Sequence, residues 1–155
     1  MATYKSFEEL DIWQRARVLA KDIYAQTMQG SFSKDFSLRD QINRSSGSIM
    51  DNIAEGFERG GTKEFITFLS YAKGSAGEVR SQIYRAHDRS HIDDSSFKLL
   101  RDEAVSVSKG ISGFINYLKS STFRGPRFHD PEVYYGLDVK DTDTKADSTI
   151  LNFEF

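Results

Sequence analysis

Residues 41–59 read Gln-Ile-Asn-Arg-Ser-Ser-Gly-Ser-Ile-Met-Asp-Asn-Ile-Ala-Glu-Gly-Phe-Glu-Arg, and two stripes at helical spacing run through this part of the chain. The first stripe is apolar or small, and a helix that advances about 100° per residue gathers it on one core-facing side. Its members are Leu38, Ile42, Ser45, Ile49, Ile53 and Phe57. This pattern predicts a helix that is capped near Ser37 and ends near Gly56.

The second stripe is entirely polar and lies roughly 110° round the helix from the first. Its members are Gln41, Arg44, Ser48, Asn52 and Glu55. A solvated helix face usually fills with Lys and Glu, whereas these amides, hydroxyl, guanidinium and carboxylate can donate to and accept from one another. Two interpretations stay open, a wet surface stripe and a buried or interfacial polar seam.

Three further segments show helical periodicity. Ser6-Phe7-Glu8-Glu9 has the form of a capping box, which predicts a first helix from there to about Gln29 with Trp13 on its core face. A third helix is predicted over about residues 63–89, with Thr62 as its N-cap, and a fourth from Asp93-Asp94 to Lys119. The third helix also carries a polar stripe, formed by Tyr71, Ser75, Glu78, Gln82, Arg85 and Arg89.

These helices predict an all-α fold, an antiparallel up-down four-helix bundle over residues 1–120. Gly47 lies in the middle of the second helix beside three serines, and we expect a close helix crossing there. Residues 121–155 hold both prolines and lack periodicity, so an irregular, flexible C-terminal tail is predicted. Its β-prone end, residues 149–155, could dock in a groove or stay mobile.

The composition and charge of the chain exclude several classes of function. The chain has 155 residues and no cysteine, which excludes thiolate chemistry and disulfides. The sequence shows neither a membrane span nor a signal peptide, so a cytoplasmic protein without membrane contact is expected. Residues 1–120 carry 17 Lys and Arg against 16 Asp and Glu, whereas residues 121–155 carry 4 against 7, so the tail is acidic. Nucleic-acid binding would therefore need local clustering of cations.

Catalysis finds little support in the sequence. His87 and His91 have a helical i, i+4 relation, but no metal-site motif surrounds them, and a surface role at a helix end is favoured. Glu55 and Glu78 could form a carboxylate pair, although ion pairing with Arg44 and Arg85 is the favoured use. We therefore expect a non-enzymatic protein without metal or cofactor.

The polar seam and its surroundings resemble the signature of a known family. The residues that carry the resemblance are Gln41, Arg44, Ser48, Asn52-Ile-Ala-Glu-Gly-Phe57, Arg59, Phe65, Phe68-Leu69, Ala72, Gly74-Ser75 and Glu78, with Leu10, Trp13-Gln14 and Ala16 in the opening helix. They are similar to the bacterial four-helix-bundle proteins first noticed as products of intervening sequences in 23S ribosomal RNA genes. The chain departs from the family pattern at Phe32-Ser33, where an aromatic-Pro pair is usual, and at Ser45-Ser46, where Ala is common.

The resemblance implies a homo-oligomeric ring, typically a pentamer, with the seam residues near the subunit contacts. It also implies a link to nucleic acid, because a related branch, the accessory variability protein of diversity-generating retroelements, binds nucleic acid and a reverse transcriptase through a basic ring surface. Two functions follow as hypotheses, an oligomer that binds RNA or DNA and an oligomeric scaffold for a protein partner. The candidate nucleic-acid-binding residues are Arg17, Lys21, Lys73, Arg80, Arg85 and Arg89, with Arg15 nearby.

Overall fold

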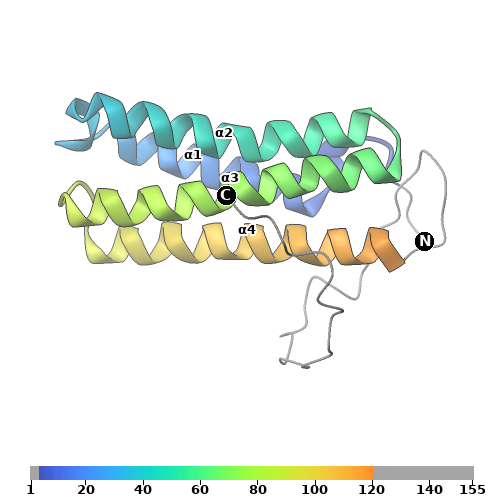
Figure 1. The fold of residues 1–155 in the computed structure, drawn as a ribbon. Coiled ribbons are helices and arrows are strands. Elements are labelled where there is room, and N and C mark those ends of the chain that lie inside the picture. The colour runs from blue at the N-terminus through green and yellow to red at the C-terminus, as the bar shows by residue number, and fades with distance from the viewer. Residues whose placement is uncertain (1–3, 121–155) are drawn as a thin grey trace, which may run out of the picture.

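The structure is a computed structural model that describes residues 4–120, so the predicted tail lies outside the described residues. The described chain forms two short 3-10 turns, η1 (Phe7–Glu9) and η2 (Phe32–Lys34), and four helices, α1 (Asp11–Thr27), α2 (Phe36–Glu58), α3 (Thr62–Asp88) and α4 (Asp94–Ser120). Consecutive helices run in opposite directions (Figure 1), and residues 4–120 contain no strand. The predicted all-α up-down bundle is therefore confirmed.

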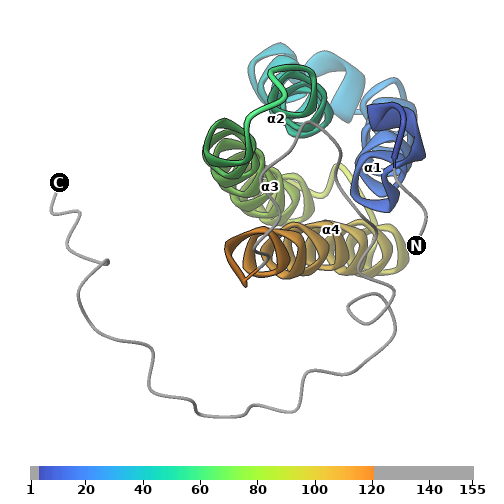
Figure 2. The ribbon, with the colours of Figure 1, turned by 90° about the vertical axis from the view of Figure 1, so that its right-hand side faces the viewer.

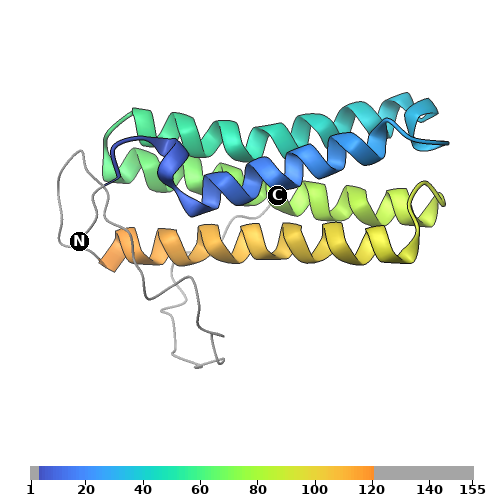
Figure 3. The same cartoon turned by 180° about the vertical axis from the view of Figure 1, so that it is seen from behind.

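The four helices occupy the corners of a quadrilateral when the bundle is seen along its axis (Figure 2). α1 lies diagonally across from α3, and α2 lies diagonally across from α4. Seen from behind (Figure 3), α1 runs beside α2 and above α4. Among neighbouring helices, the packing is most extensive between α2 and α3 and least extensive between α1 and α4. The α1–α4 edge is thus the loosest side of the bundle.

The core is built from the apolar faces of all four helices. Every member of the predicted apolar stripe of α2 is buried, from Leu38 to Phe57. In α1 the buried face is turned relative to the prediction, because Ile12 is fully buried whereas Trp13 is only partly buried at the edge of the core. Phe7 of η1 contacts the Trp13 ring edge-on at a centroid distance of 5.1 Å.

Three of the predicted caps are wrong. Ser6 makes no capping bond with its side chain, since residues 7–9 form the separate turn η1 and α1 begins only at Asp11. The N-cap of α2 is Asp35, whose Oδ1 accepts a hydrogen bond from the backbone N of Leu38 at 3.2 Å, and not Ser37. Gly61 takes the place expected for Thr62 before α3. The turns η1 and η2 precede α1 and α2 and shift the first two caps, whereas the cap of α3 lies only one residue before the expected position.

The close crossing predicted at Gly47 lies elsewhere in the described chain. A Cβ added at Gly47 would meet nothing within 4 Å, whereas one at Gly56 would lie 2.6 Å from the Cβ of Phe68 and 2.8 Å from Cδ2 of Phe65. Gly56 therefore allows α2 to approach α3 closely, whereas the sequence pattern had predicted this close approach at Gly47.

No helix within residues 4–120 is a candidate for a membrane span. None of them combines the length and the apolar composition that crossing a bilayer requires.

Candidate functional site

A polar groove of about 410 Å³ opens between α2 and α3. Both predicted polar stripes contribute to it, because antiparallel packing brings the two flanks together. The groove is lined by Gln41, Arg44, Ser45, Ser48, Ser75, Glu78, Gln82 and Arg85. The structure thus joins most of the predicted seam residues in one open surface feature.

Hydroxyl groups tie the two helices together at one end of this groove. The Oγ atoms of Ser48 and Ser75 lie 3.0 Å apart, within hydrogen-bond distance. Asn52, at the edge of the groove, donates from Nδ2 to the Oγ of Ser48 at 3.0 Å and to its carbonyl oxygen at 2.8 Å. These three polar residues therefore satisfy one another within the chain.

Gln82 leaves one buried polar atom without a partner. Its Nε2 donates to the Oγ of Ser45 at 3.0 Å, and Ser45 in turn donates to Oε2 of Glu78 at 3.1 Å. The Gln82 side chain lines the groove although the residue is only 7% exposed, and its Oε1 is buried without a hydrogen-bond partner. A buried acceptor in this state costs free energy unless a donor arrives from outside the chain.

The guanidinium groups of the seam have unequal surroundings. Arg85 donates to Oε1 of Gln41 at 3.0 Å, whereas the exposed Arg44 has neither a hydrogen bond nor an ion pair within residues 4–120. Glu55 lies outside the groove and forms an ion pair with Arg59 at 2.7 Å. The expected pairing of Glu55 and Glu78 with Arg44 and Arg85 is therefore wrong, because Arg59 is one turn away from Glu55 on the same helix.

The predicted nucleic-acid-binding cations do not converge within one chain. Arg17 and Lys21 are exposed on α1, and the Arg17 guanidinium lies 5.8 Å from the centre of the Trp13 ring. Lys73 and Arg80 are exposed on α3, diagonally across the bundle. They follow the same heptad spacing as His87, whose ring stacks on Phe97 of α4. Two separate basic pairs result.

The remaining cations of the prediction are engaged in local contacts. Arg89 donates from Nη1 to Oδ2 of Asp35 at 2.8 Å, and Nε2 of His91 lies 2.9 Å from the same oxygen. The His91 and Arg89 hydrogen bonds lower the pKa of Asp35 from 3.8 to about 2. His91 also reaches Ser31, with Nδ1 2.8 Å from Oγ. Asp35 thus joins the α1–α2 connection to the end of α3.

The two histidines of the i, i+4 pair have different partners. His87 Nε2 lies 2.7 Å from Oδ1 of Asp94, and its ring stacks on Phe97, whereas His91 stacks on Phe32. Within residues 4–120, no three His, Cys, Asp or Glu side chains are grouped so that they could hold a metal ion.

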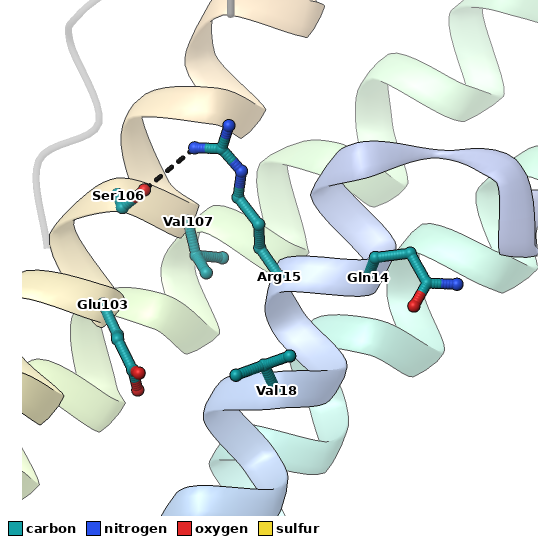
Figure 4. A pocket seen from close by; sticks show the side chains of 6 residues that line it. All are labelled: Gln14, Arg15, Val18, Glu103, Ser106 and Val107. Carbon is teal, nitrogen blue, oxygen red and sulfur yellow. Dashed lines mark hydrogen bonds between the residues drawn. The ribbon is translucent and has the colours of Figure 1, made fainter.

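A second groove, of about 250 Å³, separates α1 from α4 (Figure 4). The groove is lined by Gln14, Arg15, Val18, Glu103, Ser106 and Val107. The surface that these residues expose to the groove is mostly apolar, although several of them are polar or charged. Arg15 closes one end by donating to the Oγ of Ser106 at 2.9 Å. Val18, at the other end, is 50% exposed.

Glu103 places an unusual carboxyl group in this second groove. Its Oε2 is buried without a hydrogen-bond partner. Burial and the neighbouring carboxylate of Asp22 raise the pKa of Glu103 from 4.5 to about 7, since protonated Glu103 can donate a hydrogen bond to Asp22. No cation within residues 4–120 pairs with Glu103 or Asp22. Sequence reasoning missed this pair because its members lie on helices distant in the chain.

Comparison with known proteins relates the chain to one family and to one solved structure. The family model described as "23S rRNA-intervening sequence protein" matches residues 8–113. No curated protein matches the chain. Among solved structures, a protein of unknown function from the S23 ribosomal protein family of Bacteroides thetaiotaomicron superposes with a TM-score of 0.61 at 20% sequence identity. The superposition covers 68% of this chain and 95% of that one, and it shows a shared fold.

Proposed function

Because the chain belongs to the 23S rRNA-intervening sequence protein family, whose model matches residues 8–113, we propose that it acts as a non-enzymatic homo-oligomeric scaffold. In this proposal, copies of the bundle associate through the polar groove between α2 and α3. The assembly presents identical surfaces several times to a protein partner, and multiplicity raises its avidity. A cytoplasmic location belongs to the same proposal.

One observation carries the proposal, the unpartnered Oε1 of Gln82 in the α2–α3 groove. A buried carbonyl oxygen without a donor is destabilising by about 1 to 3 kcal/mol. Arg44, exposed in the same groove, makes neither a hydrogen bond nor an ion pair within residues 4–120. Both groups would find partners if another protein surface covered the groove. The expected number of five copies rests on the family resemblance alone.

Size-exclusion chromatography with light scattering tests the assembly. The wild-type chain is expected to elute as one species with a mass several times 17.6 kDa. Arg44→Glu, which reverses the charge at the groove, should shift the equilibrium toward single copies. Lys63→Glu, an exposed position in the first turn of α3 and outside the groove, is the matched control. A wild-type protein that elutes as a 17.6 kDa species at micromolar concentration would overturn the proposal.

Binding of RNA or DNA is the second candidate function. Its support is the outward side of α1, where Lys21 follows the Trp13–Arg17 cation–π contact by one turn. Cationic and aromatic groups side by side suit a phosphate backbone and an unpaired base. Arg85 and Arg89 support this function less, since each already makes a hydrogen bond within the chain.

A further inference from the structure

The two grooves lie on opposite edges of the bundle. In the view along the axis (Figure 2), the α2–α3 edge is across from the α1–α4 edge. A surface on one edge that complements the surface on the opposite edge lets identical copies join head to tail. Such an interface uses two different patches of each copy, and it generates a ring when the rotation closes.

Each groove holds one charged group that lacks a partner within residues 4–120, Arg44 in one and Glu103 in the other, and the two have opposite charge when ionised. The α2–α3 groove offers the unpaired guanidinium of Arg44, together with Arg85, which donates to Gln41, and Glu78, which accepts from Ser45. The α1–α4 groove is lined by Glu103, whose Oε2 has no hydrogen-bond partner, and by Arg15, which donates to Ser106, while Asp22 acts on Glu103 as a neighbouring carboxylate. Arg44 is also suited to an apolar lining, because its methylene stem can lie along Val18 while the guanidinium reaches a carboxylate. The closeness of Asp22 and Glu103 is unfavourable in the isolated chain and would be relieved by such a cation.

Counted along the helices, the two grooves lie at a similar height along the bundle. α2 and α4 begin at the same end (Figure 1), and Arg44 lies eight residues after the start of α2 while Glu103 lies nine after the start of α4. At a rise of about 1.5 Å per residue, these positions are about 12 and 14 Å from that end. Ser48 and Ser106, which also line the two grooves, each lie twelve residues after the starts of their helices.

Equal height decides which kind of assembly the contact permits. Copies that are related by rotation about an axis parallel to the helices, with no rise, meet at equal heights and can close. A difference in height would instead displace each copy along the axis and produce an open helical array.

We infer that the α2–α3 groove of one copy binds the α1–α4 groove of the next, with Arg44 of one copy facing Glu103 of its neighbour. This inference rests on the homo-oligomer proposed above and names the surface that occupies its groove. It assigns a role to Glu103, Asp22 and Val18, which lie outside the polar seam.

The absence of cysteine from the chain permits a direct test by disulfide trapping. Ser48→Cys and Ser106→Cys place one thiol in each groove without changing Arg44 or Glu103. After oxidation, the double variant is expected to give a ladder of covalent oligomers on a non-reducing gel. Each single variant is expected to stay at the mass of one chain, since equivalent positions of two copies do not face each other in a head-to-tail contact.

A disulfide dimer of the Ser48→Cys single variant would overturn the inference, because it would mean that the α2–α3 groove binds itself. A double variant that assembles by light scattering but gives no ladder would overturn it as well. Both outcomes leave the proposed homo-oligomer intact. A monomeric wild-type chain would instead overturn the proposed homo-oligomer and this inference together. The two failures are therefore distinguishable.

Charge exchange supplies a second and independent test. Arg44→Glu and Glu103→Arg should each raise the dissociation constant of the oligomer at least tenfold, and the double variant should recover most of the loss. Circular dichroism of each variant checks that the helices are intact. Equal losses that simply add in the double variant would show that the two residues do not meet, and the inference would fall.

Discussion

A Cβ placed on Gly56 would lie 2.6 Å from the Cβ of Phe68, so α2 and α3 can adopt their spacing only if position 56 lacks a side chain. Gly56→Ala is expected to lower the free energy of unfolding by about 1 to 3 kcal/mol, the usual cost of overpacking a core. Chemical denaturation at neutral pH measures this change.

Gly47 provides the matched control in the same helix. It has open space around it, so Gly47→Ala is expected to raise the free energy of unfolding by up to about 1 kcal/mol through helix propensity. Effects of the same sign at both positions would contradict the assigned crossing point.

Glu103 should make the stability of the dissociated chain depend on pH. Its folded-state pKa of about 7 lies above the ordinary 4.5, so the folded chain binds more protons than the unfolded chain between these values. The stability contributed by protonated Glu103 is present below pH 4.5 and is lost as the pH rises to about 7. Glu103→Gln should therefore raise the melting temperature more at pH 8 than at pH 5.

Thermal melts of Glu103→Gln and wild type at these two pH values check the prediction, at a concentration where light scattering reports single copies. Glu64→Gln, at an exposed position of α3, is the control. An equal shift at pH 5 and pH 8 would show that Glu103 is ionised normally in the folded chain.

Asp35 should act in the opposite direction at acid pH. Hydrogen bonds from His91 and Arg89 lower its pKa to about 2, so its contribution to stability is present above pH 3.8 and is lost as the pH falls through 2. Asp35→Asn keeps a residue that can cap α2 but removes the charge. We expect it to lower the melting temperature at pH 7 and to have little effect near pH 2. Asp40→Asn, at an exposed position nearby in α2, is the control.

Nucleic-acid binding should follow the two basic pairs separately if it occurs. Fluorescence anisotropy with structured RNA and duplex DNA at low salt measures it, and phosphate contacts would make the affinity fall steeply as salt rises. Replacement of Arg17 and Lys21, or of Lys73 and Arg80, by Ala should flatten that slope on whichever face binds. Replacement of Arg85 and Arg89 should change it less, because both are engaged within the chain.

A titration without a saturable signal at oligomer concentrations on the order of tens of micromolar would remove this function. The protein-scaffold function would then stand alone.

The sequence was sufficient for the fold because burial follows helical periodicity. The stripe from Leu38 to Phe57 is buried as predicted, since a helix has only one way to bury residues at this spacing. Details at the helix ends were not predictable with the same rule. Asp35 and Ser37 are both good caps, and the 3-10 turn η2 favours the earlier one. Likewise, η1 delays the start of α1 and turns Ile12, instead of Trp13, into the core.

The candidate site could be predicted only in part. Spacing correctly placed Gln41, Arg44 and Ser48 on one flank of a helix, because the angle between positions is fixed. Hydrogen-bond partners depend on rotamers and on the distance between helices, which spacing does not fix. Ser45 was expected in the apolar face. Its hydroxyl group nevertheless accepts a hydrogen bond from Gln82 and donates one to Glu78.

The contact between Asp35 and His91 has a consequence for the order of folding. The two residues are 56 positions apart, so closing the chain between them costs more entropy than joining successive helices. A bundle whose neighbouring helices pair locally is expected to form this contact late, after the transition state. A substitution at His91 should then speed unfolding and leave the folding rate nearly unchanged. The connection between α1 and α2 would thus act on the lifetime of the native bundle and hardly on how fast it forms.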